Sequence, residues 1–156
     1  MERRDAREKV FICDFELVDK GGRVVAYPVG LSGATEGMGL QDAIVMAADW
    51  LRETALDYLM GGEQWPDLPL GTEAARGGRM VTVAVETSLD EVPAMTAAEA
   101  ARALGVSTAR VAQLCKAGLL DSWKVGGTRM VSRESVETRA EEGSRPGRPK
   151  AETVTA

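Results

Sequence analysis

A regular alternation of apolar and polar residues over residues 10–18 predicts a β-strand. Its apolar positions are Phe11, Cys13, Phe15 and Leu17. A glycine turn follows, and residues 23–29 form a second extended segment with Pro28 near its end, where proline disturbs a strand least. The two segments predict a β-hairpin, and the glycine-rich sequence after them predicts turns with a short third strand at residues 34–38.

A helical period replaces this alternation over residues 40–60, where apolar side chains recur every three or four positions. A glycine pair ends the predicted helix, a proline-bounded loop follows at residues 65–70, and alternation returns at residues 79–86. This order predicts a first domain at residues 10–87. We expect it to be of the α+β class, with a small antiparallel sheet and one long helix.

Two short helices joined by a tight turn are predicted within residues 95–116. Thr96 and Glu99 have the spacing of a capping box at the start of the first helix, and Gly105 is placed to end it. Ser107 is a suitable cap for the second helix. A turn this short between two helices is typical of a helix-turn-helix.

The second of these helices is polar on its outer side, and a basic hairpin follows it. Gly126 and Gly127 separate two short alternating runs, which predicts a wing with a tight turn. Arginine, glutamine and threonine can contact base edges, whereas lysine neutralises phosphate. The expected major-groove residues are Arg110, Gln113 and Thr108, with Lys116 and Lys124 at phosphates and Arg129 in a minor groove. The full set of candidate DNA-binding residues is Ser107, Thr108, Arg110, Gln113, Lys116, Lys124, Thr128 and Arg129.

This stretch resembles the winged helix-turn-helix of the excisionase and MerR-like families. The resembling residues are Met95-Thr96-x-x-Glu99-Ala100-Ala101, Leu104-Gly105-Val106-Ser107, Gly118-x-Leu120, Val125-Gly126-Gly127-x-Arg129 and Ser132-x-x-Ser135-Val136. The resemblance implies a second domain that binds double-stranded DNA, at residues 95–140 and after a linker at residues 88–94. A small helical module that binds protein instead of DNA is the alternative.

The charge of the chain is divided unevenly between its two parts. The formal net charge is −5. Residues 1–93 contain 17 acidic and 9 basic residues, a net charge of −8, whereas residues 94–156 contain 7 and 10, a net charge of +3. A basic second part suits a nucleic-acid ligand, and an acidic first part suits a basic protein partner.

The first domain resembles the N-terminal domain of HicB-like antitoxins, a partial RNase H-like fold. The matching residues are Tyr27-Pro28, Leu31-Ser32-Gly33, Gly37-x-x-Leu40-Gln41-Asp42-Ala43-Ile44, Pro66 and Pro69. The chain departs from that pattern at Gly39, which stands where the family usually has a capping threonine. The start of the helix that follows should therefore be weaker.

Together the two resemblances imply a DNA-binding transcriptional regulator of a type II toxin-antitoxin system. The first domain would bind a toxin of the HicA type, and the second would bind the operator and repress the operon. Because a single short module binds DNA weakly, a homodimer formed through the first domain is expected. The alternative is an orphan excisionase or phage-repressor-like protein whose first domain only oligomerises.

Several kinds of chemistry are disfavoured by the residue content. The chain has no histidine, which removes histidine-dependent nuclease and protease mechanisms. Its two cysteines share no metal-ligand spacing, so no metal or cofactor is expected. A metal-dependent nuclease would need carboxylates such as Asp42 or Asp49 near Asp14 and Glu16, and the pair on the first strand is more simply a solvated face. We therefore expect that the protein is not an enzyme.

The two ends of the chain are expected to lie outside the domains. Residues 1–9 are a charged arm without the apolar segment of a signal peptide, and no stretch has the composition of a membrane span, so a cytoplasmic location is expected. Residues 141–156 are rich in proline, glycine and basic residues, which predicts a disordered tail that can contact phosphates.

Overall fold

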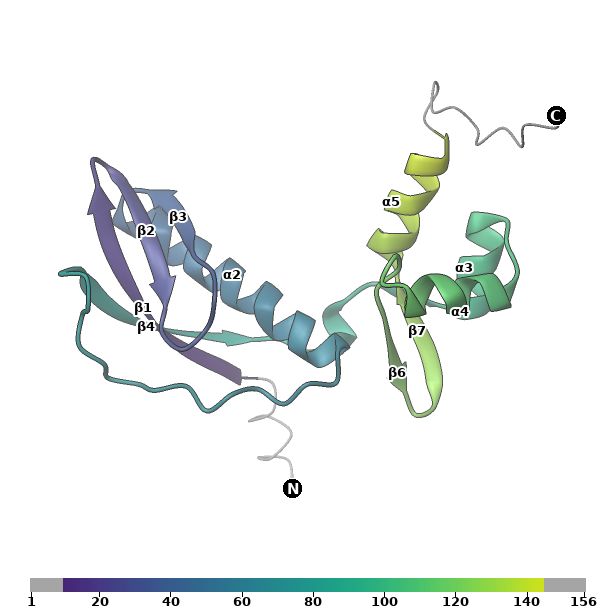
Figure 1. Ribbon diagram of the computed structural model, residues 1–156, viewed down its shortest axis with the longest axis horizontal. Coiled ribbons are helices and arrows are strands. Elements are labelled where there is room, and N and C mark those ends of the chain that lie inside the picture. Colours follow the sequence, from purple (N-terminus) through teal and green to yellow (C-terminus); the bar gives the residue numbers. More distant parts are fainter. Residues whose placement is uncertain (1–9, 145–156) are drawn as a thin grey trace, which may run out of the picture. The chain divides into compact units, whose positions relative to one another are not determined.

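A computed structural model describes residues 10–144 of the protein (Figure 1). The predicted arm at residues 1–9 and residues 145–156 of the predicted tail lie outside the described residues. The chain divides into two compact units, with the boundary between Glu91 and Val92. Unit 1 contains β1 (Val10–Lys20), β2 (Arg23–Pro28), β3 (Thr35–Met38), α2 (Leu40–Met60), β4 (Arg79–Glu86) and the short 3-10 helix η1 (Leu89–Glu91).

Unit 1 is built on a four-stranded antiparallel sheet with the strand order β3-β2-β1-β4. The predicted hairpin of the first two strands is confirmed, with Lys20 opposite Arg23 at its turn. Alternation along β1 places its apolar side chains on the face that packs against α2. The buried core of this unit consists of Phe11, Cys13, Phe15, Leu17, Val24, Ala26, Ala43, Ala47, Leu51, Ala55, Val83 and Val85. The predicted α+β class is therefore confirmed.

Small residues let α2 lie close to the sheet. Its fully buried positions are Ala43, Ala47, Leu51 and Ala55, each four residues after the last, so they form one stripe along the helix. Gly37 on β3 is also buried, and a side chain there would collide with the backbone at the first turn of α2. Gly39 occupies the N-cap position of α2, and the helix begins without a side-chain cap.

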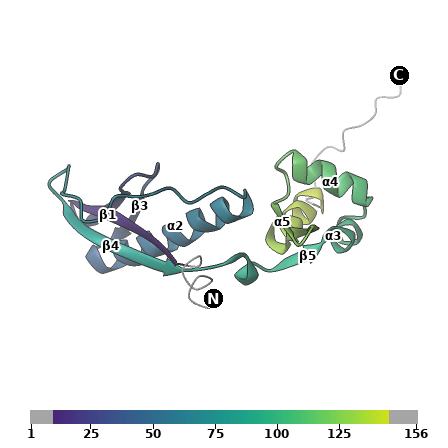
Figure 2. The same ribbon diagram turned by 90° about the horizontal axis from the view of Figure 1, so that it is seen from below.

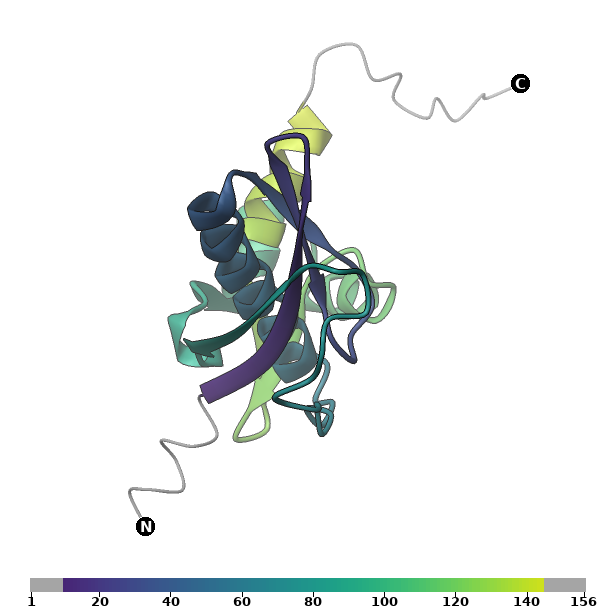
Figure 3. The ribbon, with the colours of Figure 1, turned by 90° about the vertical axis from the view of Figure 1, so that its left-hand side faces the viewer.

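A long loop at residues 61–78, which we name the covering loop, runs from the end of α2 to β4 (Figure 3). Near its start Trp65 packs against Phe11 and Tyr58 on the α2 side of the sheet, and from Thr72 onward the loop covers the opposite face. The loop contains no helix or strand, and two carboxylates of β1 anchor it by hydrogen bonds. Asp14 accepts hydrogen bonds from the backbone N–H and hydroxyl of Thr72, at 3.2 and 3.3 Å. Glu16 accepts three backbone hydrogen bonds from the end of the loop, at 2.8–2.9 Å.

The interpretation of Asp14 and Glu16 as a solvated face is therefore wrong. β1 is an inner strand of the sheet, between β2 and β4, and the two residues are only 1% and 3% exposed. Each carboxylate is buried against the covering loop, with hydrogen-bond donors that compensate for the loss of water. The alternation along β1 therefore separates two covered faces, one apolar and one polar.

Unit 2 contains a three-stranded sheet and three helices (Figure 2). Its elements are β5 (Ala94–Thr96), α3 (Ala97–Leu104), α4 (Thr108–Lys116), β6 (Ser122–Val125), β7 (Thr128–Ser132) and α5 (Arg133–Ser144). Its core residues are Met95, Ala100, Ala101, Val111, Leu114, Leu120, Val131 and Val136. The hairpin of β6 and β7 extends away from the helices in Figure 1.

The ends of the two helices follow the predicted capping chemistry. Thr96 and Glu99 form both hydrogen bonds of a capping box, at 3.2 and 2.8 Å. Gly105 adopts the left-handed conformation at the end of α3, with φ of 66°. The hydroxyl of Ser107 accepts the backbone N–H of Arg110 at the start of α4. The angle between the helices is therefore held by short-range interactions that the sequence specifies.

Two boundaries of this unit differ from the prediction. Residues 88–94 were expected to be a linker, yet η1 lies within them, and β5 begins at Ala94 and pairs with β7. That pairing joins residues about 35 positions apart, so no local pattern indicates it. The second domain was expected to end at residue 140, yet α5 (Arg133–Ser144) continues beyond it.

Candidate nucleic-acid interface

The exposed face of α4 carries most of the predicted DNA-contacting residues. Thr108, Gln113 and Lys116 are exposed, whereas Val111 and Leu114 are buried against the rest of unit 2. The outer face is completed by two small exposed residues, Ala109 and Ala112, which were not among the candidates. Because alanine adds little volume, a helix with this face can approach the edges of bases closely.

Arg110 lies on the flank of α4 and not at the middle of its outer face. Its position is one turn before Leu114, and its guanidinium donates to the side-chain oxygen of Gln113 at 3.2 Å. This hydrogen bond holds two of the predicted base-reading side chains together. Ser107 remains exposed, but its hydroxyl is already used as the helix cap.

The wing is formed by a two-residue turn at Gly126 and Gly127, whose φ angles of 55° and 84° fit the turn type preferred in tight hairpins. Lys124 and Arg129 lie directly opposite each other in the register and therefore share one face. Like charges placed opposite each other disfavour a sheet, and an anion between them would relieve this repulsion. Thr128 and Lys124 are exposed at the tip of the wing.

Arg129 is less available than the other wing residues. It is only partly exposed, and its guanidinium donates to the hydroxyl of Ser122 at 3.1 Å, which anchors the side chain along the hairpin. A minor-groove contact from Arg129 would require this hydrogen bond to break or to be shared. Lys124 is therefore the more accessible cation of the wing.

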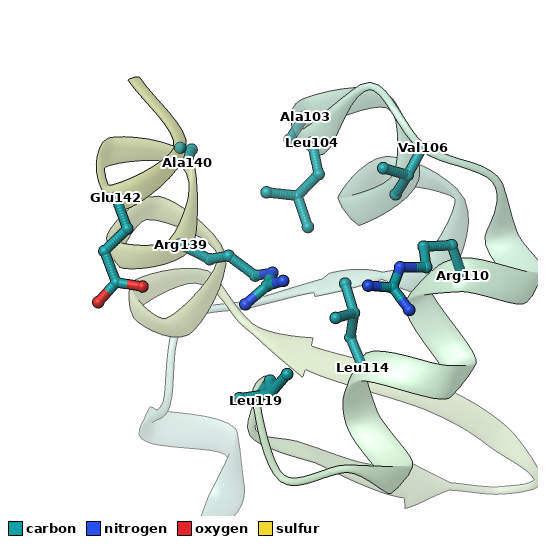
Figure 4. A pocket seen from close by; sticks show the side chains of 10 residues that line it. Ala103, Leu104, Val106, Arg110, Leu114, Leu119, Arg139, Ala140 and Glu142 are labelled. Carbon is teal, nitrogen blue, oxygen red and sulfur yellow. The ribbon is translucent and has the colours of Figure 1, made fainter. Parts of the chain in front are cut away.

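A groove of about 800 Å³ lies beside α4, between α3 and α5 (Figure 4). Its apolar lining includes Leu104, Val106, Leu114 and Leu119, and Leu119 is 54% exposed. Arg110 enters the groove from α4, and a second arginine enters from α5. This second arginine, Arg139, carries no signal in the sequence, because only the packing of α5 brings it beside α4.

The carboxylates of unit 1 do not form a metal site in the described part of the chain. No group of three or more potential metal-ligating side chains occurs among the described residues. Asp42 accepts the backbone N–H of Met38, and Asp49 pairs with Arg52, so neither joins Asp14. The arrangement that the nuclease alternative requires is absent from residues 10–144.

Hydrogen bonds from the covering loop and from β4 also fix the ionisation of these carboxylates. Burial acts to raise the pKa of Glu16, but the backbone N–H groups of Gly78, Arg76 and Ala75 outweigh it and hold the pKa below its ordinary value. The pKa of Asp14 is likewise lowered, because hydrogen bonds led by that from Thr82 outweigh burial. Both groups are therefore acceptors at neutral pH, as a structural role requires.

The thiol of Cys13 is similarly structural. Burial raises its pKa to about 11, so it stays protonated and unreactive in the core at neutral pH. Cys115 is partly buried at the inner side of α4, and both cysteines are free.

Among the helices of the described residues, none is long and apolar enough to cross a membrane.

Comparison with known families assigns unit 2. Residues 94–144 match the family model of the helix-turn-helix domain. This range begins with β5 and ends with α5, so it covers the whole of the described second unit apart from its first two residues. Neither the curated proteins nor the solved structures gave a match to the chain. The C-terminal part of the protein is a helix-turn-helix domain, which indicates a DNA-binding regulator.

Proposed function

We propose that this protein is a sequence-specific transcriptional regulator that couples operator binding to a protein partner, as an antitoxin does. The outer face of α4 is the main observation in support of DNA binding. It combines exposed Thr108, Gln113 and Lys116 with two alanines that permit close approach to base edges. The wing adds Lys124 on the same unit, where it would contact phosphate.

The binding test uses duplexes that the protein selects for itself from a random pool, since no operator is known. Arg110→Ala and Gln113→Ala should each weaken binding to the selected duplex by about 1–3 kcal/mol and relax base preference at one position. Thr35→Ala, in unit 1, is the control. Unchanged affinity and unchanged preference in both α4 variants would show that α4 is not the reading helix.

The partner part of the proposal concerns unit 1, as in a HicB-like antitoxin that masks a small basic ribonuclease of the HicA type. Two observations support it: the net charge of −8 over residues 1–93, and the order of three strands, one helix and a final strand. In this role the protein itself has no catalytic activity and acts in the cytoplasm. The first test is whether the product of the neighbouring gene co-purifies with the full chain.

A second candidate is an orphan excisionase or phage-repressor-like protein whose unit 1 only forms a homodimer. The observation in its favour is β4, an eight-residue edge strand. In the described residues it pairs with β1 alone, and it has no charge or proline between its ends. Such an edge can pair with a second copy. Dimerisation without any co-purifying toxin would favour this candidate, whereas a monomer in light scattering at micromolar concentration would exclude it.

A further inference from the structure

The groove between α3, α4 and α5 contains two guanidinium groups without an acidic partner among the residues that the structure describes. Figure 4 shows the side chains of Arg110 and Arg139 pointing toward each other from opposite walls, while the carboxylate of Glu142 points away from the groove. Within residues 10–144, neither arginine forms an ion pair with a carboxylate. Two cations facing one space repel each other unless an anion lies between them.

The position of this pair relative to α4 decides which anion fits. A helix that lies in the major groove is bordered by a sugar-phosphate backbone on each side. Arg110 is on the flank of α4 that faces α5, so its guanidinium is available to one of these backbones. Arg139 extends from α5 toward the same place and can reach a phosphate that α4 cannot reach alone.

The groove lining also suits this ligand. The lining includes half-buried Leu104 and exposed Leu119, whose apolar surfaces can pack against deoxyribose. Arginine binds phosphate through two parallel N–H donors, so a pair of arginines can hold one phosphate from both sides. Both arginines stand on helices, which fix their positions better than a mobile loop would.

We propose that Arg110 and Arg139 together form a phosphate clamp that holds one DNA strand against the flank of α4. The inference rests on the proposed DNA-binding function and adds α5 to its interface. Arg110 then has two roles, because it contacts Gln113 on the reading face and a phosphate on the flank. Arg139 has only the second role, and it positions the reading helix without reading any base.

The test measures fluorescence anisotropy of two labelled duplexes of equal length, one selected by the protein from a random pool and one of random sequence. Arg139→Gln removes the charge but keeps most of the side-chain length. It should weaken binding to both duplexes by the same factor, about tenfold, and lower the slope of log affinity against log salt by about 1. Arg139→Lys should restore the slope but not the whole affinity, because lysine lacks the paired donors.

Arg133→Gln is the matched control, since Arg133 is exposed on the same helix but does not line the groove. If both variants weaken binding equally, the effect comes from general charge and the clamp is refuted. An unchanged affinity and salt slope in Arg139→Gln, with wild-type binding intact, also refutes the clamp but leaves the proposed function standing. Failure of the wild-type chain to bind either duplex overturns both. Circular dichroism and thermal unfolding establish that each variant is folded.

Discussion

The contact between β3 and α2 gives the sharpest test of unit 1. A Cβ atom placed on Gly37 would lie 2.4 Å from the backbone nitrogen of Ala43 and 2.6 Å from the carbonyl carbon of Asp42. Ordinary contact begins at 3.4 Å, so Gly37→Ala requires the strand and the helix to separate by about 1 Å. Because both atoms belong to the backbone, no side chain can move aside to accommodate the methyl group.

Overpacking of this kind costs about 1–3 kcal/mol, and rigid neighbours place Gly37→Ala at the upper end. Loss of glycine entropy in the unfolded chain offsets about 0.4–1 kcal/mol. The expected net loss is about 2 kcal/mol, which corresponds to a decrease in Tm of roughly 8–16 °C for a unit of this size. Calorimetry of the full chain gives the decrease in Tm. Hydrogen exchange at β1 amides, measured by NMR, assigns the loss to unit 1.

Gly61→Ala is the matched control, because Gly61 has an ordinary helical φ of −75° and its nearest neighbour would be 3.4 Å from the new atom. This variant should keep its Tm or gain slightly. Equal Tm values for Gly37→Ala and Gly61→Ala would show that the close approach of β3 to α2 does not exist in solution.

Two further predictions concern the acid response of unit 1 and the capping of α3. The pKa values of Asp14 and Glu16 are lower in the folded state than in the unfolded state, so the stability they contribute is complete above their ordinary pKa values, at about pH 4–5, and is lost as pH falls further. The urea midpoint of unit 1 should therefore stay constant from pH 7 to pH 5 and decrease below pH 4. The decrease should be smaller in the double variant Asp14→Asn, Glu16→Gln. A decrease as large in the double variant as in the wild type would contradict this prediction. Thr96→Ala should lower the free energy of unfolding of unit 2 by about 0.5–2 kcal/mol, as measured by thermal unfolding, whereas Thr96→Ser should lower it little. Equal losses in the two variants would show that the capping box does not stabilise unit 2.

Local chemistry made much of this fold predictable. The β1–β2 hairpin, the extent of α2, the capping box at Thr96 and the glycine turn of the wing depend on residues within a few positions of one another. Each was predicted because alternation, helical period and glycine conformations act over that range. The confirmed parts of the fold are therefore those with short sequence separation.

The features that sequence did not reveal depend on distant segments. Asp14 and Thr72 are 58 positions apart, so nothing near Asp14 indicates that a loop will cover it. β5 is three residues long and is a strand only because β7 lies beside it. Arg139 was missed for the same reason, since its place beside α4 follows from how α5 packs. The base and phosphate contacts of α4 and the wing remain predictions.

The way in which β1 holds the covering loop bears on how this protein can diversify. Glu16 binds main-chain N–H groups at positions 75, 76 and 78, and every residue except proline supplies such a group. Anchoring therefore places little demand on side-chain identity at position 75. Arg76 also lies over the ring of Tyr27, and Gly78 is restricted because a Cβ atom there would collide with the carbonyl oxygen of Leu17. Most outward-facing residues of the loop can be exchanged over generations, or randomised in a library, while the sheet beneath keeps its shape. Unit 1 thus provides a constant frame that carries a replaceable outer surface.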